Sequence, residues 1–166
     1  MKRLYLIGGP MGVGKTTVCR CLQGRLEPSV FLDGDWCWDA HPFQVTEETK
    51  AMVLDNIVHM LNNFLCCSAY DHVIFCWVLH QQEIWNDLLN RLHAGNYAVT
   101  KVALVCTPET LRSRMEADIS AGVRSADATE RSLSYLSLYD SLNVWKLDTT
   151  GLTPEEATAA ILEAAG

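Results

Sequence analysis

Residues 9–16 have the types and spacing that bind the phosphates of a nucleotide. Their sequence, Gly-Pro-Met-Gly-Val-Gly-Lys-Thr, matches the pattern G-x-x-x-x-G-K-[ST] at every fixed position. Glycines allow positive φ angles and bring backbone amides close to phosphate oxygens. We expect Lys15 to reach the β- and γ-phosphates and Thr16 to bind a magnesium ion. The motif predicts that ATP, a purine nucleoside triphosphate, binds with Mg2+ through Gly9, Pro10, Met11, Gly12, Val13, Gly14, Lys15, Thr16 and Thr17.

Two carboxylates follow the second short apolar segment of the chain. Asp33 and Asp35 are two residues apart, so in an extended chain both side chains leave the same face. A nucleotide site of this kind needs a carboxylate near its metal. The apolar run 73–79 ends without an acid, which leaves this role to Asp33 or Asp35. The alternative is that this Asp-Gly segment forms only a turn.

The remaining sequence alternates between strand-like and helix-like segments. Short apolar runs at 4–7, 30–32, 73–79, 99–106 and 144–147 predict strands. The stretch 117–128 is polar and contains Gly122. We expect helices over 15–26, 46–66, 83–93, from 107, 128–142 and 153–165. This order predicts one α/β domain over residues 1–166, with a five-stranded parallel sheet between two helical layers and a short mobile lid at about 117–128.

Local signals place several helix ends and faces. Thr46 is expected to cap its helix, whose buried face is predicted to contain Met52, Ile57, Leu61 and Leu65. Gly95 is expected to stop the helix before it.

The composition excludes several classes of protein. The net charge is −7, which argues against general nucleic-acid binding, because that requires a basic surface. No apolar run approaches the roughly 20 residues of a membrane span. The seven cysteines include no C-x-x-C pair, so we expect reduced thiols in a cytoplasmic protein, without zinc or disulfides.

The chain resembles the P-loop family of small-molecule kinases, which includes shikimate kinase, gluconate kinase, adenylylsulfate kinase and chloramphenicol phosphotransferase. The resemblance rests on residues 9–16, the Asp-x-Asp segment, Leu111-x-x-Arg114, and the closing segment 147–156, so it spans nearly the whole chain. It implies a three-layer P-loop NTPase fold.

The resemblance also implies roles for individual residues. Asp33 would hold magnesium through water, and Asp35 would orient the acceptor hydroxyl and take its proton. Arg114 would lie against adenine or the phosphates, and Arg124 would reach the transferred phosphoryl group from the lid. The backbone around Thr150 would line the adenine pocket. The catalytic residues would therefore be Lys15, Asp35 and Arg124.

Arginine suits these roles because its planar fork matches phosphate oxygens. The alternative is an ordinary solvated helix surface with ion pairs to nearby acids, and it applies to Arg112, Arg114, Arg124 and Arg131. For Arg112 and Arg131 the sequence favours neither interpretation.

The charge pattern bears on the identity of the acceptor. Between Leu26 and Asn90 the sequence contains ten acids but only one lysine or arginine, Lys50. An acceptor that carries phosphate or carboxylate is normally bound by arginine. We therefore expect a neutral or cationic acceptor, with Asp35, Trp36, Trp38 and His80 as candidate contacts. Trp36 and Trp38 would form an aromatic wall, whereas for His80 the sequence slightly favours a capping or buried role.

The sequence thus predicts an ATP-dependent kinase that transfers the γ-phosphoryl group to a hydroxyl of a small molecule. One alternative is a nucleoside or nucleotide kinase, against which the missing arginines count. Another is a regulatory P-loop ATPase or nucleotide-dependent switch. The oligomeric state and the identity of the acceptor are left open.

Overall fold

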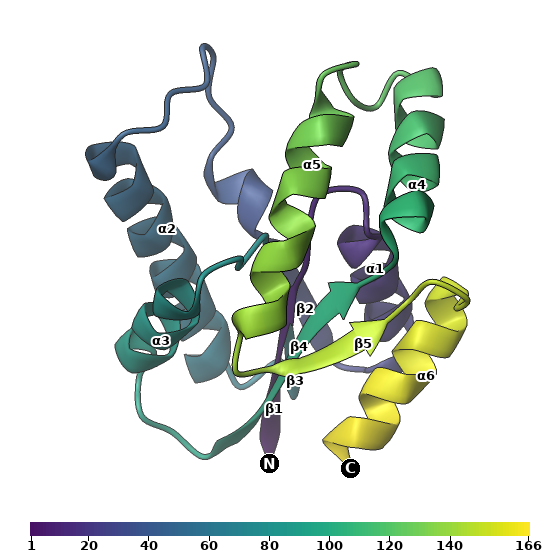
Figure 1. Ribbon diagram of the computed structural model, residues 1–166. Helices are drawn as coiled ribbons and strands as arrows, with labels where there is room; N and C mark the ends of the chain where they lie inside the picture. Colours follow the sequence, from purple (N-terminus) through teal and green to yellow (C-terminus); the bar gives the residue numbers. More distant parts are fainter.

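The protein is built on one parallel sheet with helices on both faces (Figure 1). The computed structural model describes residues 1–166. The sheet has the strand order β2-β3-β1-β4-β5. The strands are β1 (Lys2–Gly8), β2 (Ser29–Asp33), β3 (His72–Cys76), β4 (Tyr97–Val105) and β5 (Trp145–Asp148). Asp33 and Ile7 both pair with Cys76, so the carboxyl ends of β2, β3 and β1 lie level at one edge of the sheet.

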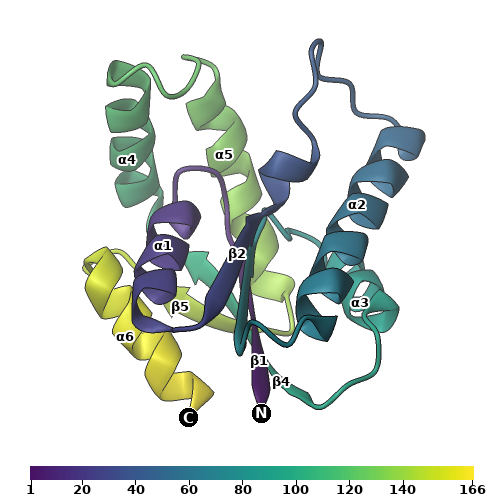
Figure 2. The same cartoon turned by 180° about the vertical axis from the view of Figure 1, so that it is seen from behind.

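The helices form the two outer layers. α1 and α6 cover one face, and α2, α3 and η2 cover the other (Figures 1 and 2). α4 and α5 rise beyond the carboxyl edge of the sheet. The helices are α1 (Lys15–Arg25), η1 (Gly34–Cys37), α2 (Glu47–Cys66), α3 (Gln82–Arg91), α4 (Pro108–Ser120), α5 (Ala128–Leu136), η2 (Ser137–Ser141) and α6 (Pro154–Ala165).

Two apolar cores hold these layers together. On one face Ile7 and Ile74 pack with Leu22 of α1 and Ile161 of α6, and on the other Phe75 packs with Ile57 of α2. All six buried positions are less than 2% exposed, and burying each such side chain contributes about 1.5–3 kcal/mol. The predicted fold class, a three-layer α/β fold with a five-stranded parallel sheet between two helical layers, is confirmed. No helix in the structure combines the length and apolar character that a membrane crossing requires.

Several predicted element boundaries differ from the structure. β3 ends at Cys76 instead of residue 79, because Leu79 adopts a left-handed backbone with φ of 40°. α3 ends at Arg91, before Gly95, and the helix predicted over 128–142 breaks into α5 and η2. In α2 the cap at Thr46 is confirmed, but Met52 is 43% exposed and Val53 takes the buried position.

Candidate active site

The phosphate-binding motif forms the loop between β1 and α1, as its spacing predicts. Gly14 precedes α1 with a left-handed φ of 104°, and no side chain caps the helix. The first amides of α1 are therefore free to bind an anion, which the helix dipole also favours. Gly12 has a φ of 83°, and a Cβ there would lie 2.3 Å from the sulfur of Met115. The loop thus needs glycine at this position both for its backbone conformation and for space.

Lys15 lies inside this loop. Its ammonium donates a hydrogen bond to the carbonyl oxygen of Pro10 at 3.0 Å. Burial lowers the pKa of the Lys15 amine, and the nearby carboxylates of Asp35 and Asp33 act in the opposite direction. The cation that the motif supplies for phosphates therefore lies within the electrostatic range of both candidate carboxylates.

The two predicted metal-binding residues lie in contact. The Thr16 hydroxyl donates to Oδ2 of Asp33 at 2.9 Å, and Asp33 is only 7% exposed. A threonine oxygen and a carboxylate oxygen at this distance fit Mg2+, which usually takes one or two protein oxygens and completes its shell with water and phosphate. No group of three or more His, Cys, Asp or Glu residues offers a separate metal cage.

Asp33 and Asp35 do not extend from one face of a continuous strand, as the sequence spacing suggested. The chain turns after Asp33 into η1, and Oδ1 of Asp33 accepts a hydrogen bond from the Asp35 amide at 3.0 Å. The turn approaches Trp77 so closely that a Cβ at Gly34 would lie 2.5 Å from its ring. The Asp-Gly turn and the proximity of the two carboxylates therefore occur together.

The Asp35 carboxyl lies at the solvent-accessible opening of this cluster. Partial desolvation raises its pKa, and the negative charge of Asp33 raises it further. The charges of Lys15 and Arg124 and a hydrogen bond from the Trp77 side chain oppose this rise. A carboxylate with a raised pKa, close to two cations, is suited to accept a proton from a hydroxyl.

The predicted lid is shorter than 117–128. Residues up to Ser120 belong to α4 and α5 begins at Ala128, which leaves 121–127 as the connecting loop. Arg124 in this loop is half-buried and close enough to influence Lys15 and Asp35. Arg112 and Arg131 are exposed and pair with Glu130 and Asp127. The charge of Arg124 thus acts on Lys15 and Asp35, whereas Arg112 and Arg131 lie on the surface.

Arg114 connects the phosphate-binding loop with the segment after β5. Its Nη1 donates to the Val13 carbonyl at 3.0 Å and to the Thr149 hydroxyl at 2.9 Å, and its Nη2 donates to the Thr149 carbonyl at 2.8 Å. Thr150, which the sequence favoured, uses its hydroxyl to bind Asp148 at 2.6 Å. The buried contact is thus made by Thr149, which lies within the segment 148–150 whose backbone was expected to line the adenine pocket.

A cavity of about 240 Å3 lies beside Arg114 and the phosphate-binding loop. This groove is where a base attached to phosphates in the loop would lie. It is also lined by parts of the β5–α6 connection and of α6: Leu152, Thr153, Pro154 and Ala157. The first three belong to the closing segment 147–156 that carries part of the family resemblance, whereas Ala157 was not predicted.

Trp36 and Trp38 do not form one aromatic wall. Trp36 packs edge-on against Phe31, with ring centroids 5.2 Å apart, and the guanidinium of Arg20 lies over its ring at 5.4 Å. Trp38 packs against Phe43 at 4.6 Å and joins the core under α2. Trp36 lies within η1, whereas Trp38 is the C-cap that follows it, with a φ of −148° and a ψ of 62°, and the two side chains pack against different neighbours.

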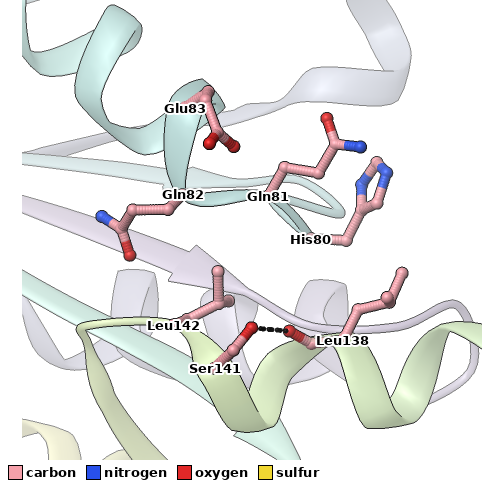
Figure 3. A pocket seen from close by; sticks show the side chains of 7 residues that line it. All are labelled: His80, Gln81, Gln82, Glu83, Leu138, Ser141 and Leu142. Atoms are coloured by element: carbon pink, nitrogen blue, oxygen red, sulfur yellow. Dashed lines mark hydrogen bonds between the residues drawn. The ribbon is translucent and has the colours of Figure 1, made fainter.

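His80 lies next to a groove between the start of α3 and η2 (Figure 3). Its ring stacks on Tyr135 with centroids 4.9 Å apart and an angle of 3°. Burial lowers the pKa of the imidazole, and its Nδ1 has no hydrogen-bond partner. The groove has a volume of about 510 Å3 and includes Gln81 and Glu83 but no lysine or arginine.

A glycine-rich loop between β1 and α1, with a paired threonine and aspartate at the carboxyl edge of a five-stranded parallel sheet, defines a P-loop kinase-like fold. Residues 6–132 match the AAA domain family AAA_18, and the chain belongs to this family. The structure is similar over its whole length to the tunicamycin resistance protein of Deinococcus radiodurans, with a TM-score of 0.77, 17% identity, and coverage of 100% of this chain and 96% of the other.

Two sugar-related kinases share the fold as well. A gluconokinase from Sinorhizobium meliloti 1021 has a TM-score of 0.69 at 16% identity, covering 98% of this chain and 93% of that protein. A sugar kinase from Janibacter sp. HTCC2649 has a TM-score of 0.70 at 16% identity, covering 98% and 94%.

A sequence similarity to much longer proteins is confined to a short segment. ABC transporter G family members 43 and 42 of Arabidopsis thaliana are 41% identical over 61 residues, which is 36% of this chain. The alignment spans only 4% of either transporter.

Proposed function

We propose that this protein is a kinase that transfers the γ-phosphoryl group of ATP to a hydroxyl group of a small neutral or cationic molecule. The observation that carries the proposal is the cluster of Lys15, Thr16, Asp33 and Asp35 at the carboxyl edge of the sheet, where Thr16 and Asp33 are in contact. In open α/β sheets ligands bind at this edge.

The proposed reaction is an in-line phosphoryl transfer. Free amides of the loop and Lys15 would hold the phosphates, and Thr16 and Asp33 would hold Mg2+, which would supply charge neutralisation when bound. The acceptor oxygen forms a bond to the γ-phosphorus as the bond to the bridging oxygen of ADP breaks. Asp35 takes the proton of the acceptor hydroxyl, and its raised pKa favours this role.

The charge of the acceptor side supports a neutral or cationic acceptor. Lys50, the sole lysine or arginine of residues 27–89, is bound to Glu47 at 2.8 Å on the exposed surface of α2. Arg20, outside that stretch in the sequence, lies over Trp36 on the α1 side and is bound to Gln23. An anionic acceptor would face Asp33 and Asp35, with Arg124 as the sole arginine of the loop above them.

An acceptor screen tests the proposal. Purified protein with Mg2+ and γ-labelled ATP is offered neutral sugars, nucleosides, tunicamycin and amino-bearing antibiotics, with gluconate, shikimate and nucleoside monophosphates as anionic acceptors. Tunicamycin and gluconate are included because proteins named for them share this fold. We expect transfer to a neutral or cationic compound; transfer to the anionic acceptors alone would contradict the charge argument.

The variant Lys15→Ala provides the matched control. Removing the cation at the β- and γ-phosphates is expected to lower transfer by orders of magnitude and to leave the circular dichroism spectrum unchanged. Wild-type transfer by this variant would show that another enzyme in the preparation is responsible.

A further inference from the structure

α4 ends in a glycine turn that brings Arg124 back beside the helix. The amide of Val123 donates to the Asp118 carbonyl at 2.9 Å, and the amide of Gly122 donates to the Ile119 carbonyl at 3.0 Å. Gly122 has a φ of 74°. These two bonds and the left-handed glycine make a Schellman motif, which sets the direction in which the chain leaves the helix.

This turn brings the side chains of Asp118 and Arg124 together. Nε of Arg124 donates to Oδ2 of Asp118 at 2.8 Å, and the two side chains are 28% and 36% exposed. Arg124 makes no other side-chain hydrogen bond, so both of its terminal nitrogens are unoccupied. In the neighbouring pair, by contrast, a terminal nitrogen of Arg112 is bound to Glu130 at 2.8 Å.

The position of Asp118 is unfavourable for the helix that carries it. It lies in the last turn of α4, where the helix dipole disfavours a negative charge. The interaction with Arg124 offsets this cost, and α4 itself gains little from the carboxylate. The main effect of the Asp118 carboxylate is therefore on the orientation of the Arg124 guanidinium and not on the stability of α4.

We infer that Asp118 is a positioning residue, which holds Arg124 by Nε so that its two terminal nitrogens point at the γ-phosphoryl group of ATP. This inference rests on the proposed nucleotide site. Two parallel N–H donors match the geometry of phosphate oxygens. The effect of the Arg124 charge on Lys15 and Asp35 agrees with a guanidinium that faces the site.

Fixing a long side chain before binding reduces the entropy lost when the ligand binds. Loss of Asp118 is therefore expected to weaken only those interactions that involve Arg124, by about 3- to 10-fold in affinity. ADP lacks the γ-phosphoryl group, so its affinity is expected to change less than twofold.

Calorimetric titration with Mg2+ and either ADP or the non-hydrolysable analogue AMP-PNP tests the inference without an acceptor. The measured quantity is the ratio of the two dissociation constants. We expect wild type to prefer AMP-PNP, D118A and R124A to lose this preference, and D118N to keep part of it through its remaining amide oxygen. The control E130A removes the partner of Arg112, in a pair of the same length, and is expected to keep the wild-type ratio.

A double variant separates positioning from other roles. If Asp118 acts through Arg124, the ratio for D118A/R124A equals that for R124A alone. A wild-type ratio in D118A, or a further loss in the double variant, overturns the inference. If D118A does not fold, the D118N variant is used instead, and a wild-type ratio of the two dissociation constants in D118N also overturns the inference. If wild type binds neither nucleotide, the proposed function itself fails.

Discussion

At the scale of single residues, Asp35 shows the cost of building a site from neighbouring carboxylates. Desolvation and the charge of Asp33 raise its pKa, so the charged form is less stable in the folded protein than in the unfolded chain. The folded state therefore binds this proton more tightly. The stabilisation that this tighter proton binding gives the folded state is fully present below the ordinary pKa of aspartate, about 3.9. It is lost as the pH rises through the higher folded pKa.

Asp35→Asn is accordingly expected to stabilise the ligand-free protein at neutral pH while lowering phosphoryl transfer. Because Asp35 is accessible to solvent, the gain should be small, about 1 kcal/mol or less. Thermal unfolding of both proteins at several pH values measures it, and the difference should vanish at low pH, where the wild-type carboxyl is neutral. A difference that grows toward low pH would contradict the raised pKa.

Some of these residue contacts were predictable and others were not. The spacing of residues 9–16 defines the phosphate-binding loop because each fixed position has a chemical role that no other residue type serves. Thr16 and Asp33 meet because parallel strands of one sheet end at the same edge. The contacts of Trp77, Thr149 and Asp118 depend instead on loop conformations, which leave no periodic signal in the sequence.

The sequence argument failed where the backbone left the extended conformation. Asp35 was placed beside Asp33 by the alternation of an extended strand, but the chain turns into η1 directly after Asp33. Likewise β3 was predicted to continue to residue 79 because its apolar run does, whereas Leu79 takes a left-handed φ. The carbonyl of Leu79 is held there by the Trp85 indole at 2.8 Å, a tertiary contact.

At the scale of elements, Arg114 of α4 holds two loops from opposite ends of the sequence. Its guanidinium binds the carbonyls of Val13 in the phosphate-binding loop and of Thr149 after β5. Both of its terminal nitrogens are thereby occupied by protein atoms. This favours a role in holding the two walls of the base groove together over direct stacking on adenine.

Arg114→Ala is therefore expected to lower both stability and nucleotide affinity. Hydrogen bonds from a charged group contribute about 1.5–3 kcal/mol each, and buried carbonyls would lose their donor. The midpoint of thermal unfolding and the dissociation constant for ADP measure the two effects. Arg112→Ala is the control on the same helix, because Arg112 is exposed and binds only Glu130. Equal effects of both substitutions would contradict the role assigned to Arg114.

At the scale of the whole molecule, the candidate site joins segments from nearly the full chain. Lys15 follows β1, Asp33 ends β2, Arg114 belongs to α4 and Thr149 follows β5, so both halves of the sheet contribute. Val13, Arg114 and Thr149 line one groove, and Asp33 contacts Thr16 of the same phosphate-binding loop. A ligand that contacts all of them binds only the folded chain, and its binding free energy therefore adds to the stability of the whole domain.

Mg2+ with AMP-PNP is expected to raise the unfolding temperature of the entire domain in a single transition. At a ligand concentration of 100 times the dissociation constant, the stabilisation is about 2.7 kcal/mol. For a domain of this size that corresponds to about 5–11 °C. Mg2+ alone should produce almost no shift, since Thr16 and Asp33 offer too few ligands without phosphate. Asp33→Asn should therefore reduce the part of the unfolding-temperature shift that depends on Mg2+. A shift with Mg2+ alone as large as that with Mg2+ and AMP-PNP would mean that the metal binds elsewhere.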